Sequence, residues 1–249
     1  NGRLILGIGV SGPQVVEGWY GQPYPKPLAR TREWVQIFRQ IVSRQKPVAF
    51  DGEHYQLPLQ GGTGLGKPLK LMHHPIREHI PLYLGAEGPK NVALSAEICD
   101  GWIPMFLSPH RMIDQYADAM HIKTPDFEIA AAVPVVIDDD VNKARAQIKQ
   151  NVGFYVGGMG AKTFNVHKDH VGRMGYADAA QEIQDLFMSG KRDEAFAAVP
   201  DELVDEIALC GPRERIRDRL QGWKDSPVTQ LNLGAVDADT LRFFAEELL

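Results

Sequence analysis

Short apolar runs alternate with amphipathic stretches along most of the 249-residue chain. Apolar runs of this length, each followed by glycine, proline or a polar cap, are typical of strands buried on both faces of a parallel sheet. Five runs are expected to form strands: 4–10, 80–86, 101–107, 127–137 and 228–236. Strands that alternate with helices predict an α/β fold with a parallel sheet and right-handed crossovers.

Helices are predicted between these strands from apolar spacing and from capping or breaker residues. The expected helices cover 28–44, the stretch from Gly88-Pro89 to Asp100, the stretch from Ser108-Pro109 to about His121, and 237–249. Asp138 to Asp140 are expected to start a further helix, and 141–225 is expected to be almost wholly helical with breaks at glycines.

Asp51-Gly52, between two extended pieces, predicts a β-hairpin, and 67–72 is expected to be extended as well. The chain is therefore interpreted as a single domain, 1–249, with a hairpin insertion at 46–79 and a helical insertion at 141–225 before the last strand.

Gly7, Gly9 and Gly12 have the spacing of a dinucleotide-binding fingerprint. That fingerprint requires a long helix at the second glycine, and four prolines in 13–27 argue against one because proline removes a helical donor. The glycines either let a flat ligand approach the end of a strand or form a turn without a ligand.

The strand at 80–86 leads into Glu87-Gly88-Pro89-Lys90, where proline stands at the first helical position. The free N–H groups beyond it and the positive end of the helix dipole suit a phosphate, and Lys90 adds charge. An ordinary proline-started helix without a ligand is the alternative.

The aromatic residues Trp19, Tyr20 and Tyr24 lie in a proline-rich loop that follows the first strand. They are expected to form a lid or pocket wall, or to fold back on the rim of the sheet.

His167 and His170 are spaced by one helical turn, but no further ligand motif accompanies them, so no metal site is predicted. Arg173 and Lys162 are candidates to meet an anionic ligand tail, and a plain helix connection is the alternative.

The formal net charge is −5, and the 27 lysines and arginines form no basic stripe, which argues against nucleic acid and anionic membranes as partners. No apolar run approaches the roughly 20 residues of a membrane helix. Two cysteines are too few for a disulfide framework and favour a reducing compartment, so a cytoplasmic location is expected.

Several stretches together resemble the bacterial luciferase-like monooxygenase superfamily, and within it the actinobacterial oxidoreductases that use the deazaflavin coenzyme F420. The stretches are GRLILGIGVSGPQVVEGWYG, FDGEHYQLP, IPLYLGAEGPKNVALSAEICDGW, ALCGPRERIRDRL and VTQLNLG. The resemblance implies a (β/α)8 TIM barrel, in which the chain would supply about strands four to eight and lack the first three β/α units. An incomplete barrel with two open sheet edges is therefore expected.

The resemblance also implies a cofactor site. Gly9, Val10, Ser11 and Gly12 would lie beside the ring or ribityl chain of F420, or of FMN as the alternative. The phosphate end would be held by Ala86, Glu87, Gly88, Pro89 and Lys90, and the loop with Trp19 and Tyr20 would border the substrate pocket. Glu87 departs from the smaller residue common in relatives and brings a negative charge toward the phosphate unless its side chain turns away.

The implied reaction is hydride transfer between F420 and a small organic substrate, with no general acid assigned. An FMN-dependent monooxygenase and a non-catalytic barrel fragment or subunit are the alternatives. The oligomeric state is open, with a homodimer among the expected assemblies.

Overall fold

The computed structural model describes residues 2–234 and 236–249, and a five-stranded parallel sheet forms its centre. The strands are β1 (Leu6–Gly9), β4 (Leu82–Gly85), β5 (Gly101–Ile103), β6 (Glu128–Ala132) and β9 (Gln230–Asn232). They lie in the order β1-β4-β5-β6-β9, and every neighbouring pair is parallel. The predicted α/β fold with a parallel sheet is confirmed.

One face of the sheet carries the core. Leu84, Trp102 and Ile129 are register neighbours on adjacent strands, and all three are fully buried. Because side chains alternate along a strand, Gly7, Gly9, Gly85 and Gly101 lie on the opposite face.

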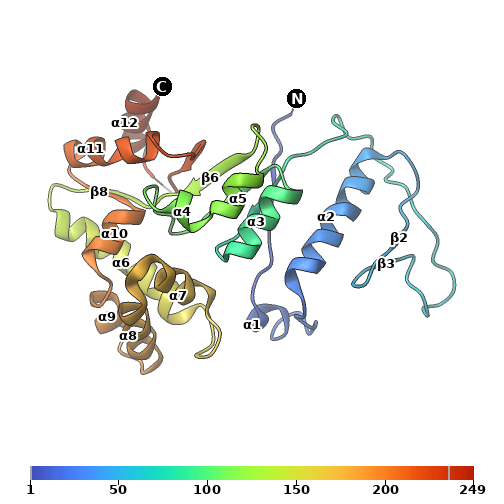
Figure 1. Cartoon of the computed structure of the whole chain (residues 1–249), viewed down its shortest axis with the longest axis horizontal. Helices are drawn as coiled ribbons and strands as arrows, with labels where there is room; N and C mark the ends of the chain where they lie inside the picture. The colour runs from blue at the N-terminus through green and yellow to red at the C-terminus, as the bar shows by residue number, and fades with distance from the viewer. Residues whose placement is uncertain (1, 235) are drawn as a thin grey trace.

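Six helices accompany the sheet in the part of the chain that the structure describes (Figure 1). They are α2 (Pro27–Ser43), α3 (Pro89–Ile98), α4 (Met112–Gln115), α5 (Ala117–Ile122), α11 (Arg213–Lys224) and α12 (Ala238–Leu248). In Figure 1, α3 and α5 lie in front of the middle of the sheet, α2 lies toward one end and α11 and α12 toward the other. None of the described helices combines the length and apolar character that a bilayer crossing requires.

The first and last strands of the order, β1 and β9, are each paired on one side only among the described residues. Leu4 and Ile5, just before β1, are about half exposed, at 57% and 46%. An unpaired edge with exposed apolar side chains is a surface that further strands can join.

The expected hairpin forms between β2 (Phe50–Asp51) and β3 (Gln56–Leu57), and a bridge from Val48 to Leu69 extends it. The turn at 52–55 is fixed to α2 by the Glu33 carboxylate, which accepts three backbone N–H groups at 2.9 Å.

The prediction of one strand over 127–137 is wrong. Strand β6 ends at Ala132, and Pro134 then separates it from β7 (Val135–Ile137), because proline cannot donate to a sheet ladder. Strand β7 pairs with β8 (Leu209–Gly211), which lies inside the stretch that the pattern predicts to be helical. A three-residue strand is too short to show a period of two.

Two further expectations need correction. Ser108-Pro109 does not begin a helix; α4 begins at Met112, and Tyr116, with φ −125° and ψ 35°, separates it from α5. The loop after β1 contains a short helix, α1 (Pro13–Val16), where no helix was expected.

The remaining helices enclose a second apolar cluster that includes Ile148, Val156, Ile183 and Leu203. These elements are α6 (Val141–Gly158), α7 (Val166–Val171), the short π-helix η1 (Gly172–Tyr176), α8 (Ala177–Met188), α9 (Arg192–Ala197) and α10 (Asp201–Ile207). As predicted, the three carboxylates 138–140 precede the first of them, and Asp140 caps α6 by accepting from the N–H groups of Asn142 and Lys143.

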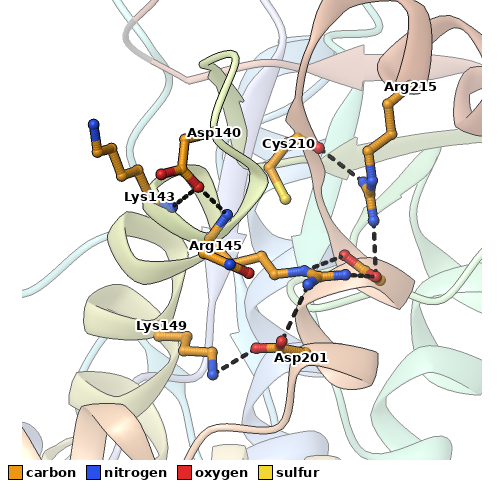
Figure 2. Close-up of polar contacts among 9 residues, drawn as sticks. Asp140, Lys143, Arg145, Lys149, Asp201, Cys210 and Arg215 are labelled. Atoms are coloured by element: carbon orange, nitrogen blue, oxygen red, sulfur yellow. Dashed lines mark hydrogen bonds and ion pairs between the residues drawn. The ribbon is translucent and has the colours of Figure 1, made fainter.

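A charge network joins these helices to β8 and α11 (Figure 2). Asp205 accepts from Arg145 at 2.7 Å and from Arg215 at 2.8 Å, while Arg145 and Lys149 also reach Asp201. Arg215 donates in addition to the carbonyl oxygen of Cys210 in β8. The network links α6, α10 and α11 through side chains of opposite charge.

Candidate functional site

Two loops leave the sheet side by side at the carboxyl ends of β1 and β4. Gly9 and Gly85 are register partners in the parallel pair of these strands. The segment from Gly9 to Gly12 and the segment from Gly85 to Pro89 therefore begin at the same rim. In parallel α/β sheets, ligands bind beyond this end of the strands.

Helix α3 begins directly at this rim. Gly88 is its N-cap with extended backbone, φ −72° and ψ 136°, and Pro89 is its first helical residue. The carbonyl of Gly88 accepts from Asn91 and Val92. Among the residues that the structure describes, none accepts from the backbone N–H groups of Glu87, Gly88 or Lys90. A helix start with free N–H groups and a positive dipole end is suited to an anion.

Three side chains fix the direction of the peptide groups in this loop. The indole Nε1 of Trp102 donates to the carbonyl of Ala86 at 2.8 Å. The Tyr116 hydroxyl and the Arg173 guanidinium donate to the carbonyl of Glu87 at 3.1 and 3.2 Å. In a trans peptide the N–H points opposite to the C=O. The N–H groups of Glu87 and Gly88 therefore face away from these three donors.

The Glu87 side chain turns into the protein and meets α7. It is 8% exposed, and its Oε1 lies 2.7 Å from Nδ1 of His167. The contact is ionic when the imidazole is protonated. The carboxylate that the sequence places near the proposed phosphate is thus paired with a histidine of the helical segment.

His170, one turn further along α7, contacts the same region. Its Nε2 donates to the carbonyl of Phe106 at 3.1 Å, and burial lowers the pKa of its ring. The neutral ring then places the lone pair of Nδ1 3.3 Å from the Tyr116 hydroxyl, as a second acceptor that competes with the carbonyl of Glu87 for the one hydroxyl proton. Burial raises the pKa of Tyr116, so this hydroxyl keeps its proton.

Phe106, whose carbonyl accepts from His170, has a strained backbone. It is 1% exposed and has φ 52°, in the left-handed region that a bulky residue rarely adopts. Its carbonyl is held by His170, so the contact and the strain coincide three residues beyond the end of β5.

His167 therefore contacts the loop at Glu87, while His170 contacts the carbonyl of Phe106 and lies beside the hydroxyl of Tyr116. Within the described ranges, no group of three or more His, Cys, Asp or Glu side chains gathers to hold a metal ion. Arg173 meets the backbone of the loop that was expected to hold the phosphate, whereas Lys162 is exposed.

A cavity of about 360 Å³ lies beside the same rim. Ile8 and Leu84 are register partners on the helix-facing side of the sheet, so the cavity lies between the sheet and the first half of α2. Its lining is mainly apolar and aromatic, with one guanidinium: Ile8, Gly9, Val10, Val16, Pro23, Tyr24, Pro27, Arg30, Thr31, Trp34, Tyr55 and Leu84.

Of the three aromatic residues in the loop after β1, Tyr24 lines this cavity. Its hydroxyl donates to the carbonyl of Ser11 at 3.0 Å. Ser11 has φ 56°, so the segment between Gly9 and Gly12 is held in a strained turn. Trp19 and Tyr20 are 82% and 66% exposed and do not line the cavity.

Three of the residues that shape the rim were not singled out from the sequence. Trp102, Tyr116 and Phe106 come from segments of ordinary apolar pattern. Trp102 and Tyr116 contact the loop across 16 and 29 positions of the chain, and Phe106 contacts His170 across 64 positions. Trp102 alone carried a signal, because it ends the Asp-Gly-Trp stretch that contributes to the family resemblance.

Comparisons with known proteins show which sequences and folds this chain is similar to. A family model described as luciferase-like monooxygenase matches residues 1–230. A Mycobacterium tuberculosis protein with the provisional name coenzyme F420-dependent oxidoreductase is 50% identical, over 98% of this chain and 73% of that protein. The 5,10-methylenetetrahydromethanopterin reductase of Archaeoglobus fulgidus is 30% identical, over 94% of this chain and 68% of the reductase.

Solved structures share the fold. The coenzyme F420-dependent tetrahydromethanopterin reductase from Methanopyrus kandleri has a TM-score of 0.71 at 20% identity, over 92% of this chain and 67% of that one. An F420-dependent secondary alcohol dehydrogenase in complex with an F420-acetone adduct has the same TM-score at 19% identity. The match covers 99% of this chain and 69% of the dehydrogenase chain. With a family model that matches most of its length, the chain belongs to the luciferase-like monooxygenase family.

Proposed function

We propose that this chain is an oxidoreductase that transfers a hydride between coenzyme F420 and a small organic substrate. The observation that carries the proposal is the shared rim, where the Gly9–Gly12 segment and the free amides at the start of α3 lie next to each other. The names of the relatives that are 50% and 30% identical support the class of reaction.

The residues at the rim fit an anionic cofactor. The amides of Glu87, Gly88 and Lys90, the exposed Lys90 side chain and the start of α3 offer donors and positive charge to a phosphate. A Cβ added at Gly9 would meet no atom within 4 Å, so the backbone there is open to a flat ring. We propose that Gly9, Val10, Ser11 and Gly12 border the ring, and that Ala86 to Lys90 hold the phosphate end.

The deazaflavin, when bound, supplies the site that accepts or donates the hydride. The chain's own part is to bind and orient. The Ser11 turn, held by Tyr24, fixes the backbone beside the ring, and the amides after Glu87 fix its anionic end. A substrate carbon must come within roughly 3–3.5 Å of the reacting ring atom.

The cavity on the helix-facing side of the sheet is our candidate for the substrate side of the site. It is lined at the end of β1 by Gly9 and Val10, which also border the proposed ring, so we propose that substrate and ring meet at this strand end. Tyr24, Trp34 and Tyr55 provide aromatic walls that exclude water, and Arg30 provides one positive group. We assign no residue as general acid. Trp19 and Tyr20 remain proposed as an outer border of this pocket, on the exposed loop before Tyr24.

We further propose that the sheet corresponds to strands four to eight of a (β/α)8 barrel in a single domain, with 46–79 and 141–225 as insertions. The strand order, the one-sided pairing of β1 and β9, and the similarity to the reductase fold support this. The free thiols Cys99 and Cys210 support a cytoplasmic location. A homodimer stays a prediction that the solution mass of the protein tests.

Titration with the two cofactors tests the function. Binding of F420, followed by loss of the visible absorbance of the oxidised deazaflavin when simple secondary alcohols are added, is the expected result. FMN, the alternative that the family resemblance implies, is the second cofactor to try. Tight FMN binding, with oxygen consumption when the FMN is supplied in its reduced form, and no F420 turnover would favour a monooxygenase. Binding of neither cofactor would favour a non-catalytic subunit.

A further inference from the structure

We propose that His167 is a positioning residue whose pairing with Glu87 sets the affinity of the rim for the anionic end of the cofactor. This inference deepens the proposed function and rests on it. It assigns the helical segment a role in the site, since His167 belongs to α7 and Glu87 to the loop between β4 and α3.

The imidazole of His167 is held in place from several sides. Asn165, the N-cap of α7, donates its side-chain amide to the carbonyl of Val156 in α6 at 2.7 Å and accepts from the N–H of Lys168 at 3.0 Å. The ring centroids of Tyr155 and Phe106 lie 5.0 and 6.3 Å from that of His167, both edge-on. His167 therefore presents Nδ1 to Glu87 from a rigid support.

The pair also governs the charge of the loop. Glu87 is 8% exposed and His167 is 19% exposed by side chain, so neither is strongly screened by solvent. Among the described residues, the other ionisable side chains that bond to this loop are the Arg173 guanidinium and the Tyr116 hydroxyl, and the neutral His170 ring lies behind that hydroxyl. Only Glu87 contributes negative charge among these, and His167 is the group that pairs with it.

Removal of His167 would leave a buried carboxylate without its partner. That carboxylate either remains charged one residue from Gly88, where it repels a phosphate, or moves and takes the loop with it. Both outcomes weaken anion binding at the amides of Glu87, Gly88 and Lys90.

A double-mutant cycle tests the proposal, with the dissociation constant of F420 measured by fluorescence titration. We expect H167Q to raise this constant about tenfold, a coupling typical of directly paired groups. The double variant E87Q/H167Q carries no unpaired charge and allows a neutral amide pair, so we expect its constant to return to within about threefold of wild type. Recovery in the double variant separates positioning from loss of packing, because a packing loss would persist.

The matched control is H79Q. His79 pairs with Asp100 at 2.7 Å, and Asp100 accepts the N–H of Leu82 at the start of β4, the strand end opposite to the rim. This variant breaks a His–carboxylate pair away from the site, in which Asp100 keeps Arg39 as a partner, and we expect its F420 affinity to equal that of wild type. Thermal melts of all variants identify any that fail to fold. The single variant E87Q completes the double-mutant cycle.

Hydrogen exchange in the cofactor-free protein gives an independent measurement. We expect the peptide that covers 85–92 to exchange faster in H167Q than in wild type and to recover in E87Q/H167Q. If wild type binds neither F420 nor FMN, the proposed function fails, while this exchange still reports on whether His167 holds the loop. Wild-type F420 affinity in H167Q, an affinity loss that E87Q does not reverse, or unchanged exchange in H167Q would overturn the inference.

Discussion

Gly9 and Gly85 face each other as register partners across β1 and β4, and this relationship positions the candidate site. It brings the strained turn at Ser11 and the free amides before α3 to one rim, although 70 or more residues separate them in the chain. The proposals for the cofactor, and for the histidine that supports its loop, depend on this juxtaposition.

The N–H of Gly88 provides the most specific test of the anion site. Gly88 has φ −72°, which proline adopts without strain, so Gly88→Pro removes the donor while keeping the backbone angle. We expect the F420 dissociation constant of G88P to rise about tenfold, the loss of one charge-assisted hydrogen bond. In the control G88A the added Cβ meets nothing within 4 Å and the N–H remains, so we expect wild-type affinity. Equal affinities in the two variants would remove Gly88 from the site.

A methyl group at Gly9 tests the position of the ring. No atom lies within 4 Å of a Cβ added there, so we expect Gly9→Ala to leave the melting temperature unchanged while it weakens F420 binding severalfold. Gly7→Ala is the control. Gly7 lies two residues earlier on the same face, and its added Cβ would only touch Ile103 at 3.5 Å. If G7A weakens binding as much as G9A, the ring does not lie at the end of β1.

Asp205 makes the stability of the helical segment depend on pH. Burial alone would raise its pKa, but hydrogen bonds from Arg145 and Arg215 outweigh burial and hold the pKa below the ordinary 3.8. Because the unfolded chain therefore takes up the proton first, the stabilisation is complete above about pH 4 and is lost as the pH falls through the folded-state pKa.

Asp205→Asn is expected to lower the free energy of unfolding by about 2 kcal/mol at neutral pH, since it removes the anion that Arg145 and Arg215 share and leaves Arg145 with Asp201 alone. It is also expected to flatten the fall in stability below about pH 4. Urea denaturation at a series of pH values measures both effects. Asp126, an exposed carboxylate, provides the control D126N, which should follow wild type. Parallel pH curves for D205N and wild type would contradict the assignment.

The thiol of Cys99 is expected to be unreactive in the folded protein. Burial, with a further contribution from Asp100, raises its pKa to about 12. Near pH 8 the folded chain should therefore react with iodoacetamide at Cys99 about a hundredfold or more slowly than the unfolded chain. Mass spectrometry of the labelled peptide over time gives the rate, and labelling of native protein at the unfolded rate would show that the thiol is accessible and ionised.

The sheet could be predicted from the sequence because each of its strands carries a local signal. The run that contains Leu84 is apolar and ends in glycine, and Pro89 marks the start of the next helix. The split after Ala132 and the pairing of β7 with β8 could not be predicted, since a three-residue strand has no readable period and its partner lies more than 70 positions away.

The site was predictable to a similar extent. The free amides after Glu87 follow from one local pattern, whereas the contacts that hold the loop come from distant segments. The spacing of His167 and His170 is visible in the sequence, while the carboxylate and carbonyl that they meet are fixed only by the packing of α7 against the rim.

Backbone amide NMR of the isotope-labelled chain during titration with F420 tests the central claim most directly. The account predicts that the largest chemical-shift changes fall on Gly9 to Gly12 and on Glu87, Gly88 and Lys90, and that they saturate together. Saturable changes confined to other parts of the chain, with these amides unmoved, would contradict it.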